Sequence, residues 1–501
     1  MSAERVRCKE ILNKIVTAEK ASELIKDGMV VGISGFTASG YPKAVPLALA
    51  ERVKTKGETM KLTLYSGASI GSEIEGAWAR ARITSKRLPY QSNKELRNSI
   101  NRGEVSYIDM HLGSVAQYVN YGMLPKINIA IIEAVAVTEN GGIVPSTSVG
   151  NSAAYVKDAD LVIVEINQSQ PLELEDMVDI YSLENPPFRK PIPIMNVGDK
   201  IGTSYIPCDK EKIAAVVMTN IQDKTRELSE LDEVSKKISN NLIEFLTKEV
   251  ENGRLPENLL PIQSGVGSVA NSVLSGLNES KFRDLTCYTE VIQDAMLDLV
   301  RNEKAKLVSG TAISPSPEGM VKFKEDIDFF KDKIVLRPQE ISNNAEIVRR
   351  LGIIAINTAL EVDIYGNVNS THVMGSRMMN GIGGSNDFGR NAYLTIFTTE
   401  SIAKNGTISS IVPMVSHVDH TEHDVMVIIT EQGVADLRGM SPRERAVAII
   451  NNCVHPDYKP MLMEYFEKAL IIGEGHTPHL LEEALSWHCR FLKEGTMKVT
   501  K

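Results

Sequence analysis

Cysteine is scarce in this chain and is not arranged in pairs. The five cysteines, Cys8, Cys208, Cys287, Cys453 and Cys489, form no CxxC motif and no regular framework. Such usage is typical of free thiols in a reducing compartment, and it disfavours a disulfide-stabilised secreted domain. We therefore expect a cytoplasmic protein whose cysteines are not paired.

Long apolar runs, a net positive charge and metal-binding motifs are also missing. Runs such as INIAIIEAVAV fall far short of the roughly 20 residues of a membrane-spanning helix. The first residues, MSAERVRCKEILNKIV, carry charges where a signal peptide has an apolar segment. The formal net charge of -9 disfavours nucleic acid or an anionic membrane as the main partner. With no HExxH motif and no cysteine cluster, we predict no metal.

What the chain does have is the length and composition of an ordinary globular protein with several domains. Its 501 residues are 43% hydrophobic and 24% charged, and a prior of about 150 residues per domain suggests two or three domains. Short apolar runs that end in glycine recur before helical patterns, as in LTLYSGAS before SEIEGAWARARI. This alternation predicts an α/β fold with parallel-rich sheets.

The two halves of the sequence resemble each other. LTLYSG at Leu62–Gly67 matches LTCYTE at Leu285–Glu290, and IAIIEAVAVTENGGI aligns without a gap on IAINTALEVDIYGNV. ISGF, which begins at Ile33, resembles QSGV, and the three matches have the offsets 223, 225 and 230. Three matches in one order at nearly one offset predict an internal duplication. We place the two related α/β domains at 1–225 and 226–501.

A long amphipathic helix is expected where the halves join. The segment RELSELDEVSKKISNNLIEFLTKEVENGRLP places apolar residues at helical spacing and charges on the other face. The apolar positions are Leu228, Leu231, Val234, Ile238, Leu242 and Phe245.

A carboxylate follows one of the repeated strands. In LTCYTEVIQDAM, Glu290 stands at the carboxyl end of the expected strand, where the first half has Gly67. Ligands of open α/β sheets bind at such strand ends. The residues alone leave Glu290 open as a helix-start charge, a ribose-binding acid or a catalytic group. Asp294, one turn further on, is read as a structural charge.

A glycine-rich turn between a strand and a helix offers an alternative function. GVGSVA at Gly265–Ala270 fits the dinucleotide fingerprint GxGxxG/A, and Glu290 lies about where the ribose-binding acid belongs. A lone match of this kind is a weak signal, and Asn271 and Ser272 put polar residues early in the helix. More generally, such a turn exposes backbone N–H groups suited to a phosphate or an oxyanion.

Three further motifs have a plain interpretation, and the first two also have a chemical one. GASIG at Gly67–Gly71 matches the nucleophile elbow GxSxG, which would make Ser69 a hydrolase nucleophile. The matched loop of the second half has no serine there, so a loop that lines a ligand site is favoured. HVDHTEHD at His417–Asp424 spaces its histidines by three, which favours a surface or interface turn over a metal site. EISNN places Asn343 before an expected helix, where N-capping suffices.

Four segments together resemble a known family. SGVGSVAN, YTEVIQD, NGIGGSNDF and TEQGVADLRG occur in this order and are similar to the acetyl-CoA hydrolase/transferase family of class I CoA-transferases. The similarity runs from GISGFTASGYPKAVP to HTPHLLEEALSWH, over essentially the whole chain. It implies a homodimer of chains with two related α/β domains and the active site between them. It also implies reversible transfer of coenzyme A between small carboxylic acids, with succinyl-CoA and acetate the expected pair.

The resemblance also implies roles for particular residues. Glu290 of YTEVIQD would be the nucleophile, and Asn343 of EISNN and Glu431 of TEQG would orient the nucleophile and the substrate. Lys224 stands at the position of a family arginine for coenzyme A, and lysine lacks the planar fork of that arginine. Backbone amides would hold the oxyanion and coenzyme A, and these belong to Val266, Gly267, Gly383 and Gly384. Two serines, Ser69 and Ser92, would line the substrate pocket.

The implied mechanism is a ping-pong exchange through a covalent intermediate. Attack of Glu290 on an acyl-CoA gives an acyl-glutamyl anhydride, and the released thiolate converts it to a glutamyl-CoA thioester. Coenzyme A thioesters are thus substrates, and no cofactor is expected. The alternatives are an acyl-CoA hydrolase, by water attack at Glu290 or through Ser69, a propionyl- or butyryl-CoA-specific transferase, and a module that only binds coenzyme A or a dinucleotide.

Overall fold

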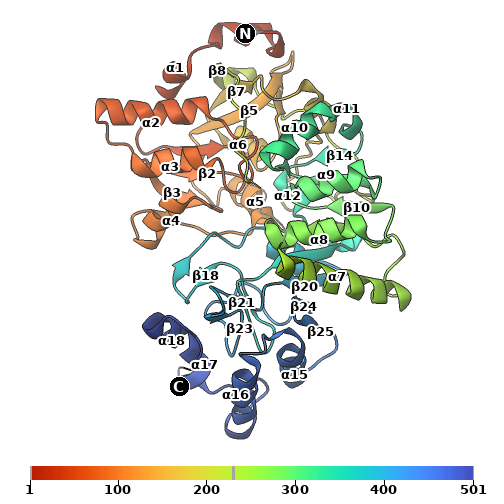
Figure 1. The fold of residues 1–501 in the computed structure, drawn as a ribbon. Helices are drawn as coiled ribbons and strands as arrows, with labels where there is room; N and C mark the ends of the chain where they lie inside the picture. Colours follow the sequence, from red (N-terminus) through yellow and green to blue (C-terminus); the bar gives the residue numbers. More distant parts are fainter. Residues whose placement is uncertain (1–2, 228–231, 500–501) are drawn as a thin grey trace. The chain divides into compact units, whose positions relative to one another are not determined.

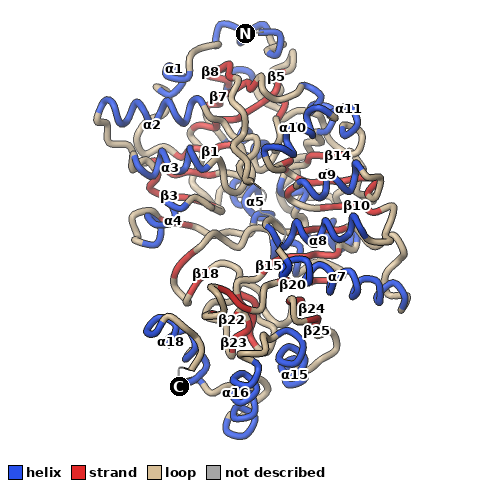
Figure 2. Tube along the Cα trace, viewed as in Figure 1, coloured by secondary structure: helices blue, strands red, loops and turns tan. Residues whose placement is uncertain are grey.

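The computed structural model describes residues 3–227 and 232–499 (Figure 1). The chain divides into two compact units. Unit 1 contains Met1–Leu228, Thr286–Val300 and Lys306–Leu351, and unit 2 contains Ser229–Leu285, Arg301–Ala305 and Gly352–Lys501. Helices and strands alternate along most of the chain (Figure 2), which confirms the predicted mixed α/β fold. Within the described residues, no helix is long and apolar enough to cross a membrane.

Unit 1 is built on a mostly parallel sheet in the order β4-β3-β2-β1-β5-β7-β8, with β6 antiparallel to β5. All nine residues of β5 are buried, as expected for a central parallel strand that is covered on both faces. The strands are β1 Val30–Ile33, β2 Leu62–Tyr65, β3 Thr84–Leu88, β4 Ser106–Tyr107, β5 Ile129–Val137, β6 Ile143–Pro145, β7 Leu161–Asn167 and β8 Ile213–Thr219.

Unit 1 also holds a second set of strands, β14-β12-β10 in that order, and a short parallel pair, β11 with β13. Only the first residues of β10 and β12 fall in unit 2. The strands are β10 Leu285–Tyr288, β11 Val291–Ile292, β12 Ala305–Gly310, β13 Ala312–Ile313 and β14 Ile334–Leu336.

The helices of unit 1 follow the strands. One apolar core packs β1, β2 and β5 against α1, α2 and α3, and Trp78 is fully buried in it. The helices are α1 Ala18–Ser22, α2 Ala44–Lys56, α3 Ser72–Arg80, α4 Lys94–Asn101, α5 Val115–Asn120, α6 Ser152–Asp158, α9 Asp294–Arg301, α10 Pro317–Glu325, α11 Ile327–Phe330, α12 Gln339–Ser342 and α13 Ala345–Leu351.

Unit 2 contains the strands β9-β15-β20-β24-β25 in that order, and β25 alone is antiparallel to its neighbour. These strands are β9 Ile262–Ser264, β15 Ile354–Thr358, β20 Leu394–Thr398, β24 Val427–Thr430 and β25 Gly433–Asp436. Its smaller strands are β16 Glu361–Asp363, β17 Val368–Asn369, β18 His372–Val373, β19 Arg377–Met378, β21 Ile402–Ala403, β22 Ile408–Ser409 and β23 Ile411–Val412. Its helices are α7 Glu233–Glu251, α8 Ser268–Glu279, α14 Ser385–Gly389, α15 Pro442–Cys453, α16 Lys459–Ile472, α17 Leu481–Ala484 and α18 Ser486–Glu494.

The strand order repeats in the manner that a duplication requires. The sequence matches pair β1 with β9, β2 with β10 and β5 with β15. The order β4-β3-β2 of the first sheet has its counterpart in β14-β12-β10, and β1-β5-β7-β8 has its counterpart in β9-β15-β20-β24. The boundary between 225 and 226 stays a prediction, because compactness groups Thr286–Val300 and Lys306–Leu351 with the first half.

The helix expected at the join is α7, which lies in unit 2 and packs on α8. Asp232 caps it by accepting a hydrogen bond from the backbone N–H of Ser235 at 2.7 Å. Ile238, Leu242 and Phe245 are buried as predicted, whereas Leu228 and Leu231 lie outside the described residues. The two helices approach closely because α8 has Gly276, where a β-carbon would lie 2.1 Å from the Ser239 hydroxyl.

Candidate active site

The backbone of Glu290 is fixed directly after β10. Its carbonyl oxygen accepts hydrogen bonds from the N–H groups of Thr311 at 2.8 Å and Ala312 at 3.1 Å. The next two residues pair with Ala312–Ile313 as β11 and β13. Glu290 therefore stands on a bend that is held from both sides, and its side chain is half-buried.

The side chain of Glu290 has a partner in Asn343. The Nδ2 atom of Asn343 donates a hydrogen bond to Oε1 of Glu290 at 2.5 Å. Asn343 is 3% exposed and follows the last residue of α12, so the expectation that it caps a helix start was wrong. Its neighbour Asn344 takes that place instead, since its side-chain oxygen accepts from the N–H of Glu346 at 3.0 Å.

The orientation of the Asn343 amide is set by Ser342. The Ser342 hydroxyl donates to Oδ1 of Asn343 at 2.8 Å, which leaves the NH₂ group to face the carboxylate. Helix α12, which carries Ser342 and ends just before Asn343, is tied to the strand before Glu290, because the Tyr288 hydroxyl donates to the carbonyl of Ile341 at 2.7 Å. The sequence reasoning missed Ser342, for which the only signal was its place beside Asn343.

A titratable group lies near this pair on α12. Glu340 is 5% exposed, and burial raises the pKa of its carboxyl to about 7, with Arg189 and Lys157 opposing the shift. The general rule is that burial disfavours the charged form of a carboxyl group. A buried carboxyl with a raised pKa is therefore present on the helix that ends just before Asn343.

The loop of Ser69 packs beside the segment of Glu290 in unit 1. Ala68 and Val291 belong to one small apolar cluster with Phe36, Leu112 and Ala312. Gly67, the counterpart of Glu290, has no room for a side chain, because a β-carbon there would lie 2.6 Å from the carbonyl of Gly35. The crowding explains why the first half has a glycine at the position of the second half's carboxylate.

Ser69 and Ser92 are placed differently in this region. Ser69 is 2% exposed, and in the described part of the chain its hydroxyl is hydrogen bonded to no histidine and no carboxylate. The elbow interpretation, which needs such a base, therefore has no support in the structure. Ser92 is half-buried, and its carbonyl accepts from the Arg97 guanidinium at 3.2 Å.

Lys224 is exposed, although the residue before it is not. The carboxylate of Asp223 is 1% exposed, and the backbone N–H of Lys224 donates to the Tyr41 hydroxyl at 3.1 Å. Within residues 3–227 and 232–499, the Lys224 ammonium takes part in no ion pair or hydrogen bond. The buried carboxylate of Asp223 thus directly precedes the exposed ammonium group of Lys224.

The other predicted residues belong to unit 2. Val266 and Gly267 lie between β9 and α8, and Gly267 has φ 129°, which disfavours any other residue. Gly383 has φ 64°, and Gly384 is the residue before the short helix α14. The two loops are both glycine turns at helix starts, where backbone N–H groups are not used by the helix.

Glu431 follows β24 and is held by its own unit. Its carboxylate accepts from the N–H of Ser401 at 2.9 Å, from the Ser401 hydroxyl, and from the Gln432 side chain at 2.9 Å. The side chain is therefore fixed by several donors and is only half-buried.

The histidine-rich segment is partly a core element. His420 is 1% exposed, so the surface-turn interpretation was wrong for this residue. Its Nε2 atom lies 3.1 Å from the Ser385 hydroxyl, and its Nδ1 atom lies 3.2 Å from Nδ2 of Asn386. His420 thereby fixes the helix start that follows Gly383 and Gly384. No group of metal-ligating residues is found in the part of the chain that the structure describes.

Comparison with known proteins bears on the family of the chain. Residues 1–218 match the model of the acetyl-CoA hydrolase/transferase N-terminal domain, and residues 319–466 match that of the C-terminal domain. The succinyl-CoA:acetate CoA-transferase of Clostridium kluyveri is 67% identical over 498 residues, 99% of this chain and 93% of that protein. The acetyl-CoA hydrolase of Schizosaccharomyces pombe is 46% identical over 514 residues, 99% of this chain and 98% of that protein.

A solved structure shows the same fold at lower identity. RipA from Yersinia pestis superposes with a TM-score of 0.71 at 22% identity, over 92% of this chain and 98% of that one. Both domain models and relatives matched over 99% of the chain lead to one assignment. The chain belongs to the acetyl-CoA hydrolase/transferase family, an enzyme family.

Proposed function

We propose that the protein transfers coenzyme A between small carboxylic acids, converting succinyl-CoA and acetate to succinate and acetyl-CoA. The observation that carries the proposal is the Glu290 carboxylate, fixed after β10 and hydrogen bonded to Asn343 at 2.5 Å. The 67% identity to a succinyl-CoA:acetate CoA-transferase supports the substrate pair. We further propose that the enzyme works as a homodimer in the cytoplasm.

Each step conserves an activated acyl bond. A carboxylate oxygen of Glu290 attacks the thioester carbonyl, and the C–S bond breaks. CoA departs as the thiolate, and an acyl-glutamyl anhydride is formed. The thiolate then attacks the glutamyl carbonyl, which releases the first acid and forms glutamyl-CoA. The acceptor carboxylate attacks this thioester, and the same steps in reverse release the new acyl-CoA. Covalent catalysis of this type divides one difficult transfer into easier ones.

The remaining residues have proposed roles in holding charge and substrate. The backbone amides of Val266, Gly267 and Gly384, with Gly383 shaping its loop, hold the oxyanions, and one such donor is typically worth roughly 2.7–4 kcal/mol. Asn343 and Glu431 orient the nucleophile and the substrate. Ser69 and Ser92 line the substrate pocket, and Lys224 binds a phosphate of coenzyme A.

Trapping the intermediate tests the central step. Incubation with succinyl-CoA followed by borohydride converts a glutamyl-CoA thioester to an alcohol, and peptide mass mapping then locates it. We expect the label on Glu290, and we expect Glu290→Gln to have neither label nor transfer. The control Glu318→Gln changes an exposed glutamate on α10 that pairs with Lys322. Full transfer activity in Glu290→Gln is the outcome that overturns the proposal.

A second candidate is acyl-CoA hydrolysis, because the relative from Schizosaccharomyces pombe is an acetyl-CoA hydrolase. Water would then attack the Glu290 intermediate. A matrix of acyl-CoA donors against acetate, propionate, butyrate and succinate separates the candidates. Thioester consumption that ignores every added acid favours hydrolysis, and a different best pair favours a propionyl- or butyryl-CoA-specific transferase. Tight binding of coenzyme A or NADH without turnover favours a binding module.

A further inference from the structure

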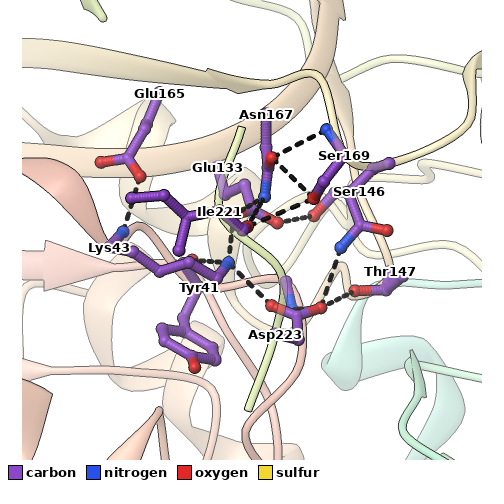
Figure 3. A network of polar contacts seen from close by, with 12 residues as sticks. Tyr41, Lys43, Glu133, Ser146, Thr147, Glu165, Asn167, Ser169, Ile221 and Asp223 are labelled. Atoms are coloured by element: carbon purple, nitrogen blue, oxygen red, sulfur yellow. Dashed lines mark hydrogen bonds and ion pairs between the residues drawn. The ribbon is translucent and has the colours of Figure 1, made fainter. Parts of the chain in front are cut away.

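Three charged side chains form a buried cluster in unit 1 (Figure 3). The ammonium of Lys43 contacts the carboxylate of Glu133 and lies 2.7 Å from Oδ1 of Asp223. The side chains of all three are at most 1% exposed. The cluster has no part in the steps proposed above, and buried charges need a specific arrangement to be tolerated.

The first half of the cluster follows from two neighbouring strands. Glu133 of β5 and Glu165 of β7 stand in register, so their side chains leave the sheet on the same face. Glu165 accepts hydrogen bonds from the N–H groups of Lys43, Ala44 and Val45, at 2.6, 2.9 and 3.1 Å. The backbone N–H groups at the start of α2 thus bind the carboxylate of Glu165, and the Lys43 ammonium binds that of Glu133.

The second half ties down the chain that follows β8. The carbonyl of Ile221 accepts from Asn167 at 2.6 Å and from Ser169 at 3.2 Å. The Oδ2 atom of Asp223 accepts from Thr147, Gln170 and the N–H of Gly40 at 3.0, 3.0 and 3.2 Å, and Ser39 lies at 3.5 Å. The segment that leads to Lys224 is therefore held at both Ile221 and Asp223.

The same turn also adjoins the frame of the proposed nucleophile. The Ser39 hydroxyl donates to the carbonyl of Ile313 at 2.5 Å, and the Ser314 hydroxyl donates to the carbonyl of Thr37 at 2.7 Å. Ile313 belongs to β13, which pairs with β11 directly after Glu290. One turn before α2 thus contacts both the Lys224 segment and the support of Glu290.

Lys43 itself is unsuited to covalent chemistry. Burial opposes its charge, but Asp223 and Glu133 more than offset this, so the pKa of Lys43 is raised. A permanently protonated amine has no lone pair with which to attack a substrate. Its charge instead neutralises Asp223, and among residues 3–227 and 232–499 the neighbouring Lys224 has no counter-ion.

We infer that Lys43 and Asp223 are positioning residues for coenzyme A binding, because their buried ion pair fixes the backbone from which Lys224 reaches solvent. The inference rests on the proposed function, in which Lys224 binds a phosphate of the thioester. Tyr41 acts in the same way, since its hydroxyl accepts the N–H of Lys224 at 3.1 Å.

The test compares acetyl-CoA with acetyl-N-acetylcysteamine, a thioester that lacks the nucleotide and its phosphates. For acetyl-CoA, we expect Lys224→Ala to raise KM roughly tenfold, the effect of about one lost charge contact. Asp223→Asn and Tyr41→Phe are expected to raise the same KM about 3- to 10-fold. For the truncated thioester, kcat/KM stays unchanged in all three variants. If the role of these residues is purely structural, the variants lower kcat/KM for both thioesters together, and this result contradicts the inference.

A double-mutant cycle identifies the route of the effect. If Asp223 acts through Lys224, Asp223→Asn has no further effect on KM in the Lys224→Ala background. Additive effects overturn the inference, whereas no effect of Lys224→Ala alone overturns the proposed coenzyme A role of that lysine. Tyr65→Phe is the matched control for Tyr41→Phe, because it removes another buried tyrosine hydroxyl, which donates to the carbonyl of Pro125. Tyr41→Phe retains the ion pair and decides the test if Asp223→Asn does not fold.

Discussion

The side-chain amide of Asn343 lies 2.5 Å from the carboxylate of Glu290, and the oxygen of the same amide accepts from Ser342 at 2.8 Å. The two residues are 53 positions apart in the chain. They meet because the strand before Glu290 and the helix before Asn343 are joined by the hydrogen bond of Tyr288 to Ile341. A carboxylate held in one rotamer is already oriented for attack, which lowers the entropic part of the barrier.

Removing the Asn343 amide is expected to slow the covalent step. A hydrogen bond to a charged group contributes about 1.5–3 kcal/mol. Since 1.36 kcal/mol corresponds to tenfold in rate, Asn343→Ala lowers kcat about 10- to 150-fold while KM for the thioester changes little. Steady-state kinetics measure the split. Asn101→Ala, at the exposed end of α4, is the control, and an unchanged kcat in Asn343→Ala contradicts the role.

Ser342 is expected to act through Asn343. Without its hydroxyl, the Asn343 amide loses the contact that selects its orientation, and a neutral hydrogen bond contributes about 0.5–1.5 kcal/mol. Ser342→Ala should therefore lower kcat roughly 2- to 10-fold, and Ser342→Thr should restore much of it. Ser22→Ala removes another buried hydroxyl that bonds a helix carbonyl, and it should leave kcat unchanged. Equal losses in both alanine variants refute a specific role.

The stability of the protein is expected to depend on pH through Glu340. Burial raises its pKa to about 7, above the unfolded value near 4.5, so folding takes up a proton between these values. The contribution of this group to stability is complete below pH about 4.5 and is lost as pH rises through 7. As the pH rises from 5 to 8, the free energy of unfolding of Glu340→Gln should therefore increase relative to that of the original protein, by about 2–3 kcal/mol.

Urea unfolding at a series of pH values measures this difference. Other buried carboxyl groups are the same in both proteins, so their titration cancels in the comparison. Glu318→Gln, which changes an exposed glutamate, should track the original protein at every pH. If Glu340→Gln also tracks it, the carboxyl of Glu340 does not titrate in this range.

A buried ion pair at the end of β14 is expected to be structurally essential. The Arg337 guanidinium contacts the carboxylate of Asp179. It also donates hydrogen bonds to the carbonyl of Val197 at 3.1 Å and to that of Asp199 at 2.5 Å. Removing one member of a buried pair leaves the other charge uncompensated and costs about 3–5 kcal/mol. Urea unfolding of Arg337→Met should show this loss.

An exposed pair gives the comparison for Arg337. Arg80 lies 2.5 Å from Glu95, but its side chain is 62% exposed. Exposed pairs contribute about 0–1 kcal/mol because solvent screens them, so Arg80→Met should unfold nearly as the original protein does. Similar losses in the two variants would show that burial of Arg337 is not what matters.

Local patterns predicted much of the fold because they depend on neighbouring residues. The apolar run IAIIEAVAV became the fully buried strand β5, and the repeat with IAINTALEVDIYGNV marked β15 as its counterpart. Glu290 was located at a strand end by the same comparison. The local context of Asn343 suggests an N-cap, which is wrong, whereas the family resemblance implies that it orients the nucleophile. Only the fold brings the carboxylate of Glu290 to its amide. The roles of the site residues stay predictions.

The sequence by itself determined the alternation of strands and helices, the repeat, and the presence of a carboxylate where the first half has a glycine. These depend on hydrophobic period and on residue type, which are readable one segment at a time. Tertiary structure decided which polar groups meet: Asn343 with Glu290, and Lys43 with Asp223. It also decided why Gly67 has no side chain, since the carbonyl of Gly35 occupies that space. Buried charges and amides find partners far along the chain, and only packing specifies which ones.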